Sequence, residues 1–544
     1  MDKQCACDFT ADPEACKKHE RGHRVSGRYH IYKGDVYTSF FRGSMVIIGI
    51  LLQFAVMLLG SLLLLRYSVL LYFVLELIGV VFSVYIVYDS ESYRYFWLVI
   101  ILLFPVIGLF LYFFWGSRLV NARARKRLMR EIDAAQAVLP TGDAELAQLD
   151  SESHGQLPCA RYLVSEHIPL YKNTAVRFYP LGDDLREELV NDLRHAKETI
   201  WIEFFIVLGG EVWDEIEGIL AEKVKEGVDV RLLIDDVGSI RMINRAFIRR
   251  MKSIGVNLSI FAPIHKDLTK LSLNYRNHQK ALVIDGHIGY TGGINLSDEY
   301  FNLYPKYGHW KDTAVRMEGE AVSALSAMFI GIWNYTVGKR ADARIAPELA
   351  LPKTRTEEPE NGGMIQPFYC GPLKNKHNNA DMVYQSLISH AKKYLWITTP
   401  YLVLDRAMGD ALIRAAKSGV DVRLYTPRHY DKWYVYRVTE SSYGKLLREG
   451  VRIFEYVPGF IHAKNLVTDD ECAVCGSINL DYRSFYFHYE SATIFYGGST
   501  VGDIKQDMIA TQKLCEEIVL EKWKKRPAYR KLVGRVLRFF SPLF

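Results

Sequence analysis

Cysteine is scarce in this sequence: the 544 residues include only eight, too few for disulfides to hold together a chain of this length. A dominant charge is also lacking, because 68 Lys and Arg stand against 62 Asp and Glu, a net charge of +6. This excess is modest for a protein dedicated to duplex DNA, but it fits a phosphate-bearing substrate or an anionic membrane surface. A cleavable signal peptide is absent as well, since the first apolar run begins about 44 residues into the chain and no A-x-A site follows it. The 49% of hydrophobic residues excludes global disorder.

Long apolar runs are concentrated near the N-terminus. Met45–Leu65, Val69–Tyr88 and Tyr95–Trp115 contain 20 or 21 residues each, the length of helix that crosses a bilayer core. Glu76 interrupts the second run and would be costly at the centre of a lone helix, so two and three spans both stay open. Seven basic residues flank one side of the spans and four the other, which by the positive-inside rule places the larger C-terminal part in the cytoplasm. We therefore expect a multi-pass membrane protein, with the side of its N-terminus undecided.

The rest of the chain repeats itself. AKETIWIEFFI at Ala196–Ile206 matches AKKYLWITTPY at Ala391–Tyr401, and KEGVDVRLL at Lys225–Leu233 matches KSGVDVRLY at Lys417–Tyr425. Each match has a helical stretch, or a helix end with a glycine stop, leading into a short apolar run, which predicts βαβ units around a buried sheet. The sequence therefore predicts two similar α/β domains, one after the other.

These patterns divide the chain into six regions. They are an N-terminal Cys/His-containing tail (1–44), a transmembrane region of two or three helices (45–115), a basic linker (116–160), a first α/β domain (161–340), a linker (341–363) and a second α/β domain (364–544). The end of the second domain, Lys522–Phe544, mixes basic and apolar residues. It is predicted to be a basic amphipathic helix, either on an anionic lipid interface or packed on the catalytic domain.

Each half carries the same set of polar residues. H-Q-K-A-L-V-I-D runs from His278 to Asp285, and H-A-K-N-L-V-T-D runs from His462 to Asp469. Six residues after each motif comes a second one, G-G-I-N-L in the first half and G-S-I-N-L in the second. Two copies of this combination at one spacing are a strong signal for a functional site.

The residue types point to phosphoryl chemistry. A His and a Lys two positions apart on a strand face the same way, so each motif presents an imidazole beside an ammonium. With the two copies facing each other, one imidazole attacks phosphorus while the other protonates the leaving alcohol. Lys280 and Lys464, together with Asn295 and Asn479, would stabilise charge on the phosphate oxygens. This scheme requires no metal and no cofactor.

The paired H-x-K-x4-D motifs with G-[GS]-x-N resemble those of the phospholipase D superfamily. Within it, T-P-Y-L at Thr399–Leu402, the N-terminal apolar runs and the Ser-Pro-Leu-Phe ending are similar to bacterial cardiolipin synthases, over about residues 45–544. The resemblance implies two tandem phospholipase D-like α/β domains that form one bilobal catalytic unit in the bacterial cytoplasmic membrane. It also implies a phosphatidyltransferase that passes the phosphatidyl group of one phosphatidylglycerol to another, giving cardiolipin and glycerol.

The resemblance further implies roles for individual residues. His278 would be the nucleophile that forms a phosphatidyl-histidine, and His462 the general acid and base. Asp312, in H-W-K-D-T, and Glu490, in H-Y-E-S-A, occupy the positions of carboxylates that orient the histidines. The motif residues Asp285 and Asp469, which complete the catalytic set, would support structure.

Two features depart from the family pattern. Cys472 and Cys475 fall between motif Asp and Gly of the second half, where packing in a strand is favoured over a redox or zinc pair. Matching residues of the two halves are 195 positions apart at Gly255 and Gly450, but only 184 apart at His278 and His462. The first half therefore has 11 extra residues within Pro263–Asn277. This insertion is either a solvated loop or a lip for lipid headgroups; it includes His265, Lys266, Lys270, Tyr275 and Arg276.

Other readings stay open. Cys5, Cys7, Cys16, His19 and His23 have spacings that suit one zinc ion, although an unstructured tail is favoured. The same motifs occur in phospholipase D-type hydrolases, in other phosphatidyltransferases and in nucleases, and a non-catalytic membrane lipid-binding protein is a further alternative. A nuclease has no need of the apolar runs, so we expect membrane lipid and phosphatidylglycerol, not nucleic acid, as partners. The acceptor lipid and the oligomeric state are not predicted.

Overall fold

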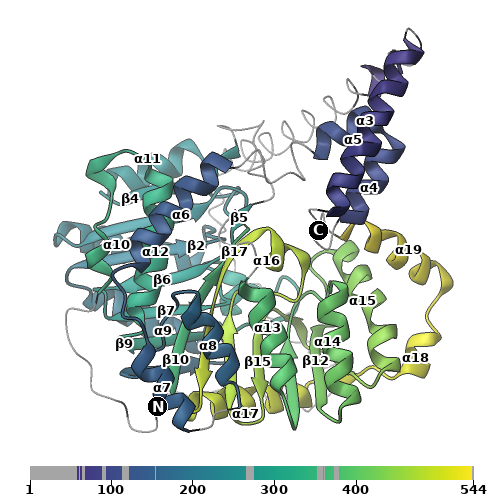
Figure 1. Ribbon diagram of the computed structural model, residues 1–544. Coiled ribbons are helices and arrows are strands. Elements are labelled where there is room, and N and C mark those ends of the chain that lie inside the picture. The colour runs from purple at the N-terminus through teal and green to yellow at the C-terminus, as the bar shows by residue number, and fades with distance from the viewer. Residues whose placement is uncertain are drawn as a thin grey trace, which may run out of the picture.

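The structure is a computed structural model that describes residues 68–88, 94–112, 122–152, 155–264, 275–351, 362–372 and 379–541, with Pro359 and a few isolated positions between 55 and 66 (Figure 1). The N-terminal cysteines and histidines lie outside the described residues, so zinc binding there stays a prediction. Most of the first apolar run also lies outside them.

The second and third apolar runs form helices that project from one corner of the α/β body (Figure 1). They are α3 (Val69–Tyr88), α4 (Arg94–Leu103) and α5 (Pro105–Leu111). The third run is therefore not one continuous helix: it breaks at Phe104, because Pro105 lacks an N–H and disfavours helical backbone at the residue before it. In the part of the chain described, no helix has both the length and the apolar character to cross a bilayer. The multi-pass arrangement stays a prediction.

The region predicted as a basic linker is helical. It forms α6 (Ala122–Gln136), α7 (Asp143–Ser151) and α8 (Leu157–Ser165). Leu128 and Ile132 of α6 are buried in a core shared with the long helix of the first half, and α8 packs into the core of the second half. Apolar residues spaced along these helices thus attach the segment to both halves.

Seven strands form the sheet of the first half, in the order β1-β9-β7-β6-β2-β3-β4. Their bounds are β1 (Thr174–Tyr179), β2 (Thr199–Phe204), β3 (Asp229–Asp235), β4 (Asn257–Phe261), β6 (Lys280–Ile284), β7 (Ile288–Gly292) and β9 (Ala314–Gly319). The strands β2, β3 and β4 run parallel, as predicted for βαβ units, and β6 joins them in the antiparallel sense.

The second sheet has the order β10-β17-β16-β15-β11-β12-β13-β18. Its strands are β10 (Met364–Cys370), β11 (Tyr394–Thr398), β12 (Asp421–Pro427), β13 (Arg452–Tyr456), β15 (Asn465–Thr468), β16 (Cys472–Gly476), β17 (His488–Tyr496) and β18 (Cys515–Glu517). Apart from the added edge strand β18, strands that match in sequence occupy matching places in the two sheets. The predicted α/β repeat is confirmed as a mixed α/β fold.

Helices cover these sheets. In the first half they are α9 (Gly182–His195), α10 (Glu211–Lys225), α11 (Arg245–Ser253) and α12 (Val322–Val337). In the second they are α13 (Asn379–His390), α14 (Arg406–Lys417), α15 (Trp433–Arg448), α16 (Tyr482–Tyr486) and α17 (Ser499–Lys513). Gly227 and Gly419, just past α10 and α14, have φ of 93° and 94°, which explains the glycine stops seen in the repeat.

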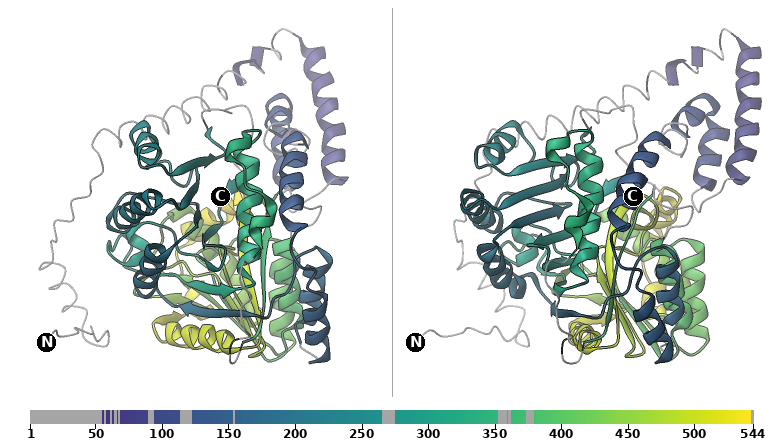
Figure 2. Two further views of the ribbon diagram at one scale, coloured as in Figure 1. Left: turned by 90° about the vertical axis from the view of Figure 1, so that its left-hand side faces the viewer. Right: turned by 60° about the vertical axis from the view of Figure 1, so that its left-hand side comes forward.

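The two halves share one apolar core. It contains Trp201 and Val283 from the first sheet and Trp396 and Val467 from the second, together with most of α12. In the turned views the first half, in teal, and the second, in green to yellow, lie side by side with α6 and α12 along their boundary (Figure 2). The halves therefore form one bilobal body.

Short strands also cross between the halves. The strand β5 (Arg276–Asn277) of the first half pairs in parallel with β17 of the second. In the opposite direction, β14 (Gly459–Ile461) of the second half pairs in parallel with β8 (His309–Lys311) of the first. Each crossing strand lies immediately before a histidine motif, so each motif is delivered to the edge of the other half.

The C-terminal segment forms α18 (Leu520–Lys524) and α19 (Ala528–Phe539). Gly534 of α19 is buried against α15, and Phe540 packs against an aromatic cluster of α4 and α5 that includes Trp97. The predicted amphipathic helix is present, and one of its faces packs on the catalytic body.

Candidate active site

The two motif histidines lie at the crossings between the halves. The backbone N–H of His278 donates to the carbonyl of Tyr489 at 2.9 Å, and that of His462 donates to the carbonyl of Lys311 at 2.7 Å. Each histidine thus follows a strand of its own half and is fixed by the backbone of the opposite half. Both are buried, with 7% and 6% of their surfaces exposed.

Each imidazole bonds a buried carboxylate from the opposite half. Nδ1 of His278 lies 2.8 Å from Oε2 of Glu490, and Nδ1 of His462 lies 2.6 Å from Oδ2 of Asp312. A carboxylate only accepts hydrogen bonds, so Nδ1 of His278 carries the proton and its Nε2 keeps a lone pair. Nδ1 of His462 has a second polar neighbour, since Nζ of Lys464 lies 2.7 Å away. Asp312 and Glu490, the two carboxylates predicted from the sequence, thus each bond the motif histidine of the opposite half.

The carboxylates are held differently in the two halves. Glu490 also accepts from the hydroxyls of Ser477, at 2.5 Å, and Ser484, at 2.8 Å. The first-half counterpart of Ser477 is Gly293, where a Cβ would lie 2.1 Å from Oδ1 of Asp312. The difference between G-G-I-N-L and G-S-I-N-L follows: the serine bonds the longer glutamate, whereas the aspartate leaves no room for a side chain.

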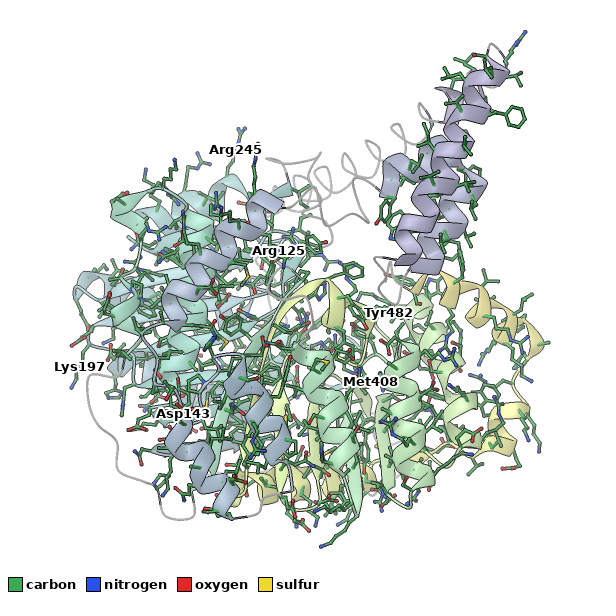
Figure 3. All side chains as sticks on the ribbon, viewed as in Figure 1. Arg125, Asp143, Lys197, Arg245, Met408 and Tyr482 are labelled. Atoms are coloured by element: carbon green, nitrogen blue, oxygen red, sulfur yellow. The ribbon has the colours of Figure 1, made fainter. Side chains whose placement is uncertain are left out.

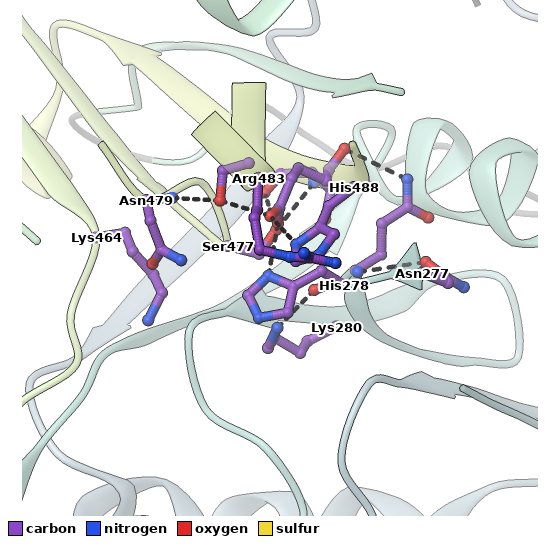
Figure 4. Close-up of polar contacts among 12 residues, drawn as sticks. Asn277, His278, Lys280, Lys464, Ser477, Asn479, Arg483 and His488 are labelled. Carbon is purple, nitrogen blue, oxygen red and sulfur yellow. Dashed lines mark hydrogen bonds and ion pairs between the residues drawn. The ribbon is translucent and has the colours of Figure 1, made fainter. Parts of the chain in front are cut away.

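The motif lysines lie beside their own histidines. Nζ of Lys280 donates to the backbone carbonyl of His278 at 2.5 Å (Figure 4). Lys464 makes the same bond to His462. Both side chains are 1% exposed. Burial lowers the pKa of Lys280 to about 7 and that of Lys464 to about 8, against partial compensation by buried carboxylates. An anionic ligand between them would favour the charged ammonium forms.

The asparagines of the second motifs are also at hand. Oδ1 of Asn295 accepts from the backbone N–H of Ile206 at 3.0 Å, which leaves its buried Nδ2 without a partner among the described residues. On the other side, Oδ1 of Asn479 is buried without a described partner. Each amide therefore keeps one polar atom for a ligand.

The motif aspartates are away from the histidines. Asp285 accepts backbone N–H bonds from Lys197, Glu198 and Thr199 at 2.7–2.9 Å. Asp469 accepts the equivalent three bonds, from residues 392–394 at 2.7–2.9 Å. Asp285 and Asp469 both have positive φ, of 53° and 58°, in the turn that follows the motif strand. Neither carboxylate is an ionic partner of a motif histidine.

Aromatic rings enclose the histidines unequally. His462 is flanked by Tyr300 and Trp310, with ring centroids at 5.3 and 5.7 Å. His278 is flanked by Phe205 at 4.8 Å and by a third histidine, His488, at 5.2 Å. Sequence reasoning missed His488, although its position two residues before Glu490 on one strand places it on the same face.

One group of residues has the donor atoms for a metal ion. Ligand atoms of His278, His488 and Glu490 lie within 4.8 Å of one another. Most of these atoms already have protein partners: Arg483 donates to Nε2 of His488 at 3.0 Å, and the glutamate accepts from His278 and two serines. Nδ1 of His488, 3.5 Å from Oε1 of Glu490, has no hydrogen-bond partner among the described residues. The group is therefore built as a hydrogen-bond network around His278.

Burial and positive charge shape the protonation of the site. Burial lowers the pKa of both motif histidines well below the usual value, and Lys280 and Lys464 add to that lowering. Burial also raises the pKa of Asp312 to about 6, although Lys464 opposes the rise. The imidazoles are thus neutral and nucleophilic around neutral pH.

One basic residue of the first-half insertion, Arg276, is buried, which fits neither of the predicted alternatives, a solvated loop or a headgroup lip. Arg276 is 1% exposed and forms a two-pronged ion pair with the fully buried Asp235, with Nη2 2.8 Å from Oδ1. An arginine sequestered in this way cannot meet a lipid headgroup. Residues 265–274 lie outside the described residues, so their part of the prediction stays open.

The cysteine pair of the second half is structural. Cys472 and Cys475 are both fully buried in β16, and burial raises the pKa of their thiols. The prediction that they pack in a strand is confirmed.

Comparison with known proteins identifies the family. A family model described as "Cardiolipin synthase, PLD-like domain" matches residues 189–333 and 384–511, and one described as "Phospholipase_D-nuclease N-terminal" matches residues 77–117. Cardiolipin synthase 2 of Bacillus anthracis is 33% identical over 82% of this chain and 86% of its own length. A cardiolipin synthase of Halalkalibacterium halodurans is 32% identical over 82% and 88%, and an uncharacterized protein of Streptococcus mutans is 37% identical over 82% and 95%.

Solved structures agree at the level of the fold. The crystal structure of phosphatidylserine synthase from Haemophilus influenzae superposes with a TM-score of 0.54 at 15% identity, over 69% of this chain and 95% of the other. The fold and the paired motifs define a phospholipase D-superfamily enzyme. The chain belongs to the cardiolipin synthase family of that superfamily, and the prediction of a phosphatidyltransferase is confirmed.

Proposed function

We propose that the protein joins two molecules of phosphatidylglycerol into cardiolipin and releases glycerol. The observation that carries this proposal is the pair of buried imidazoles, each bonded through Nδ1 to a carboxylate of the opposite half. Such a pair can run a displacement in two steps, with one ring as nucleophile and the other as proton carrier.

In the first step, Nε2 of His278 attacks phosphorus of the donor lipid. The P–N bond forms as the P–O bond to glycerol breaks, and His462 gives its proton to the departing glycerol oxygen. In the second step, His462 takes the proton of a primary hydroxyl on the acceptor lipid, whose oxygen attacks phosphorus and breaks the P–N bond. Lys280, Lys464 and the free Nδ2 of Asn295 bind the non-bridging oxygens throughout, whereas the free Oδ1 of Asn479 can only accept and suits a hydroxyl of the substrate.

The low pKa of both imidazoles suits His278 as the nucleophile, but His462 must hold a proton to act as the acid. A bound phosphodiester places a negative charge between the rings and opposes the lysines that lower the pKa of His462. The hydrogen bond between His462 and Asp312 further stabilises the imidazolium form of His462. Substrate binding itself therefore prepares the acid.

Membrane attachment is the second part of the proposal: the N-terminal helices insert into the bacterial cytoplasmic membrane as a multi-pass anchor, with the catalytic body on the cytoplasmic side. Leu70, Phe73, Leu77 and Val81 are 62–78% exposed, and they belong to α3, the helix that projects from the α/β body (Figure 3). Exposed apolar side chains in this number are costly in water and stable in lipid. The excess of basic residues after the third apolar run supports the cytoplasmic side.

The test is the purified protein in detergent with phosphatidylglycerol, its products read by mass spectrometry. Cardiolipin with an equal amount of glycerol is the expected result, and His278→Ala and His462→Ala should each abolish it without loss of folded protein. Phosphatidic acid as the main product would instead show a hydrolase. An adduct on the peptide of His462 in the His278→Ala variant would reverse the assigned roles.

A further inference from the structure

A single lysine outside the motifs combines exposure with proximity to both histidines. Lys432, at the N-cap of α15, is 46% exposed, whereas Lys280 and Lys464 are 1% exposed. Burial and then the motif lysines lower the pKa of both imidazoles most; Lys432 adds a smaller lowering in each case, while its partner Asp431 raises the pKa of His462. An ammonium that reaches solvent therefore lies near the site, and the carboxylate beside it partly offsets its effect on the imidazoles.

The lysine is held in place by neighbouring side chains. Its Nζ donates to the hydroxyl of Tyr401 at 2.9 Å and to Oδ2 of Asp431 at 2.5 Å, and the tyrosine hydroxyl donates to the same carboxylate oxygen at 2.6 Å. An ammonium has three donors, so one N–H is left for a ligand.

This arrangement lies on the side of His462. The ring of Tyr401 is 6.5 Å from that of Phe460, which in turn is 5.9 Å from that of His462. Tyr401 belongs to T-P-Y-L, whose Thr399 hydroxyl accepts from the backbone N–H beside Asn479. Alignment of β3 with β12 places Ser239 and Ile240 of the first half opposite Asp431 and Lys432. The cation is therefore specific to one side of an otherwise two-fold site.

The proposed reaction is asymmetric in the same sense. The alcohol that leaves on the side of His462 is glycerol, which is neutral. The alcohol that enters there is the glycerol end of a second lipid, which carries its own phosphate three carbon atoms from the attacking hydroxyl. A cation beside His462 is therefore useful in the second step and has no anion to bind on the departing alcohol in the first.

We propose that Lys432, positioned by Tyr401 and Asp431, binds the phosphate of the acceptor and so selects an anionic glycerol-bearing alcohol over water and neutral alcohols. The proposal rests on the transferase function above and names the acceptor side of that same site. Asp431 and Tyr401 are positioning residues, since they act through the ammonium.

The experiment measures how one intermediate divides between two acceptors. A short-chain phosphatidyl-p-nitrophenol serves as donor, so release of p-nitrophenol reports formation of the phosphatidyl-histidine. Glycerol 3-phosphate and glycerol compete as acceptors; the first has the diol and the phosphate of the acceptor lipid, and neither can act as a donor. The ratio of their products depends only on the second step.

The wild type should favour glycerol 3-phosphate, and Lys432→Gln should lower the product ratio about fivefold, the size expected for one partly exposed ion pair. The initial rate of p-nitrophenol release should stay within about twofold, and Lys432→Arg should keep most of the preference. Lys445→Gln is the matched control, because Lys445 is an exposed lysine of the same helix that pairs with Asp410.

Three results would overturn the subsite. One is an unchanged product ratio in Lys432→Gln, and another is an equal fall of the ratio in Lys445→Gln. The third is a fall in p-nitrophenol release with no change of ratio, which would assign Lys432 to the first step. If the wild type releases p-nitrophenol but transfers to neither alcohol, the transferase function itself fails, and the subsite fails with it.

Discussion

At the scale of single residues, each motif histidine of the site bonds a buried carboxylate that comes from the opposite half. Glu490 is fully buried and bonds His278, while Asp312 is fully buried and bonds His462. A carboxylate in this position fixes the tautomer that exposes Nε2 and stabilises the imidazolium form.

We expect Glu490→Gln and Asp312→Asn each to lower kcat about 100-fold or more, because an amide removes the negative charge and permits the wrong tautomer. Thermal unfolding should change little, since the amides keep the shape of the side chains. Steady-state kinetics in micelles measure the effect. Glu471→Gln, at an acidic residue of the second half that accepts from the backbone N–H of Gly155, is the control. Near-normal kcat in either site variant would rule out the orienting role.

The lysines make a second expectation. With the pKa of Lys280 about 7 and that of Lys464 about 8, both are partly deprotonated at pH 8 in the free enzyme. A phosphodiester anion raises the pKa of these ammoniums and of the imidazoles, so its binding at pH 8 should take protons up from the buffer. Calorimetry with glycerophosphoglycerol, which does not itself titrate near this pH, measures the uptake in two buffers of different ionisation enthalpy.

Proton release in that experiment, or heats that are the same in both buffers, would contradict the expected protonation states. Lys280→Arg offers the matched variant, because a guanidinium stays charged at pH 8 and should reduce the uptake. The same reasoning gives the direction of the pH profile: substrate binding should weaken as the pH rises above about 8, where the ammoniums lose their charge.

The sequence predicted which polar residues lie together in the structure, but not which of them form pairs. Two motifs at equal spacing were enough to find both histidines, both lysines and both asparagines, because the chemistry leaves a short, fixed pattern on one strand. Which carboxylate meets which histidine depends on β5 and β14 crossing between lobes, and no local pattern encodes that crossing. His488 was missed for the same reason, since its importance comes from a neighbour 210 positions away in the chain, His278.

At the scale of elements, the C-terminal helices combine two roles that the sequence could not separate. Arg526 forms an ion pair with Glu440 at 2.9 Å and lies over the ring of Trp523 at 4.4 Å, so it fastens α18 and α19 to α15. On the outer face of α19, Tyr529, Leu532 and Val536 are 52–63% exposed. The composition showed a basic amphipathic helix, but not which of its basic residues are used for packing.

We expect Arg526→Gln to lower the free energy of unfolding by about 1–2 kcal/mol, because it leaves the mostly buried Glu440 with only one of its two guanidinium partners, Arg437. The double change Lys524→Gln and Lys525→Gln should leave stability alone and weaken association with anionic vesicles by about 1 kcal/mol per charge, more at low salt. Thermal unfolding and vesicle sedimentation separate the two effects. Equal loss of stability in both variants would make the whole segment structural.

The third apolar run forms two helices where the sequence predicted one. Its composition gave a single span, whereas Pro105 divides it into α4 and α5. Proline ends or bends a helix, so Pro105 already indicated a break, but the single span was predicted from the apolar length of the run alone. The helices of the segment 116–160 were missed because their apolar residues are few and only become a packed face against α12.

At the scale of the whole molecule, the lobes are interlocked. They share one apolar core and exchange strands β5 and β14. A protein nicked at an engineered protease site between Leu351 and Pro359 should therefore run as one particle on a sizing column and keep most of its activity. The second lobe expressed alone should have none.

Separation of the nicked halves under native conditions, with loss of activity, would contradict that picture. The uncut protein bearing the same inserted site is the control for the insertion itself.

Duplication usually provides a spare copy, and the crosswise bonds of Glu490 and Asp312 remove that benefit. Damage to the motif of one repeat cannot be covered by the intact repeat beside it, since each lends its carboxylate to the other and neither owns a complete set of catalytic groups. Two defective chains in one cell, one lacking His278 and the other His462, should likewise fail to rescue each other. In genetic terms the repeats behave as one indivisible locus of function, and an inactivating lesion in either repeat is a lesion in the whole.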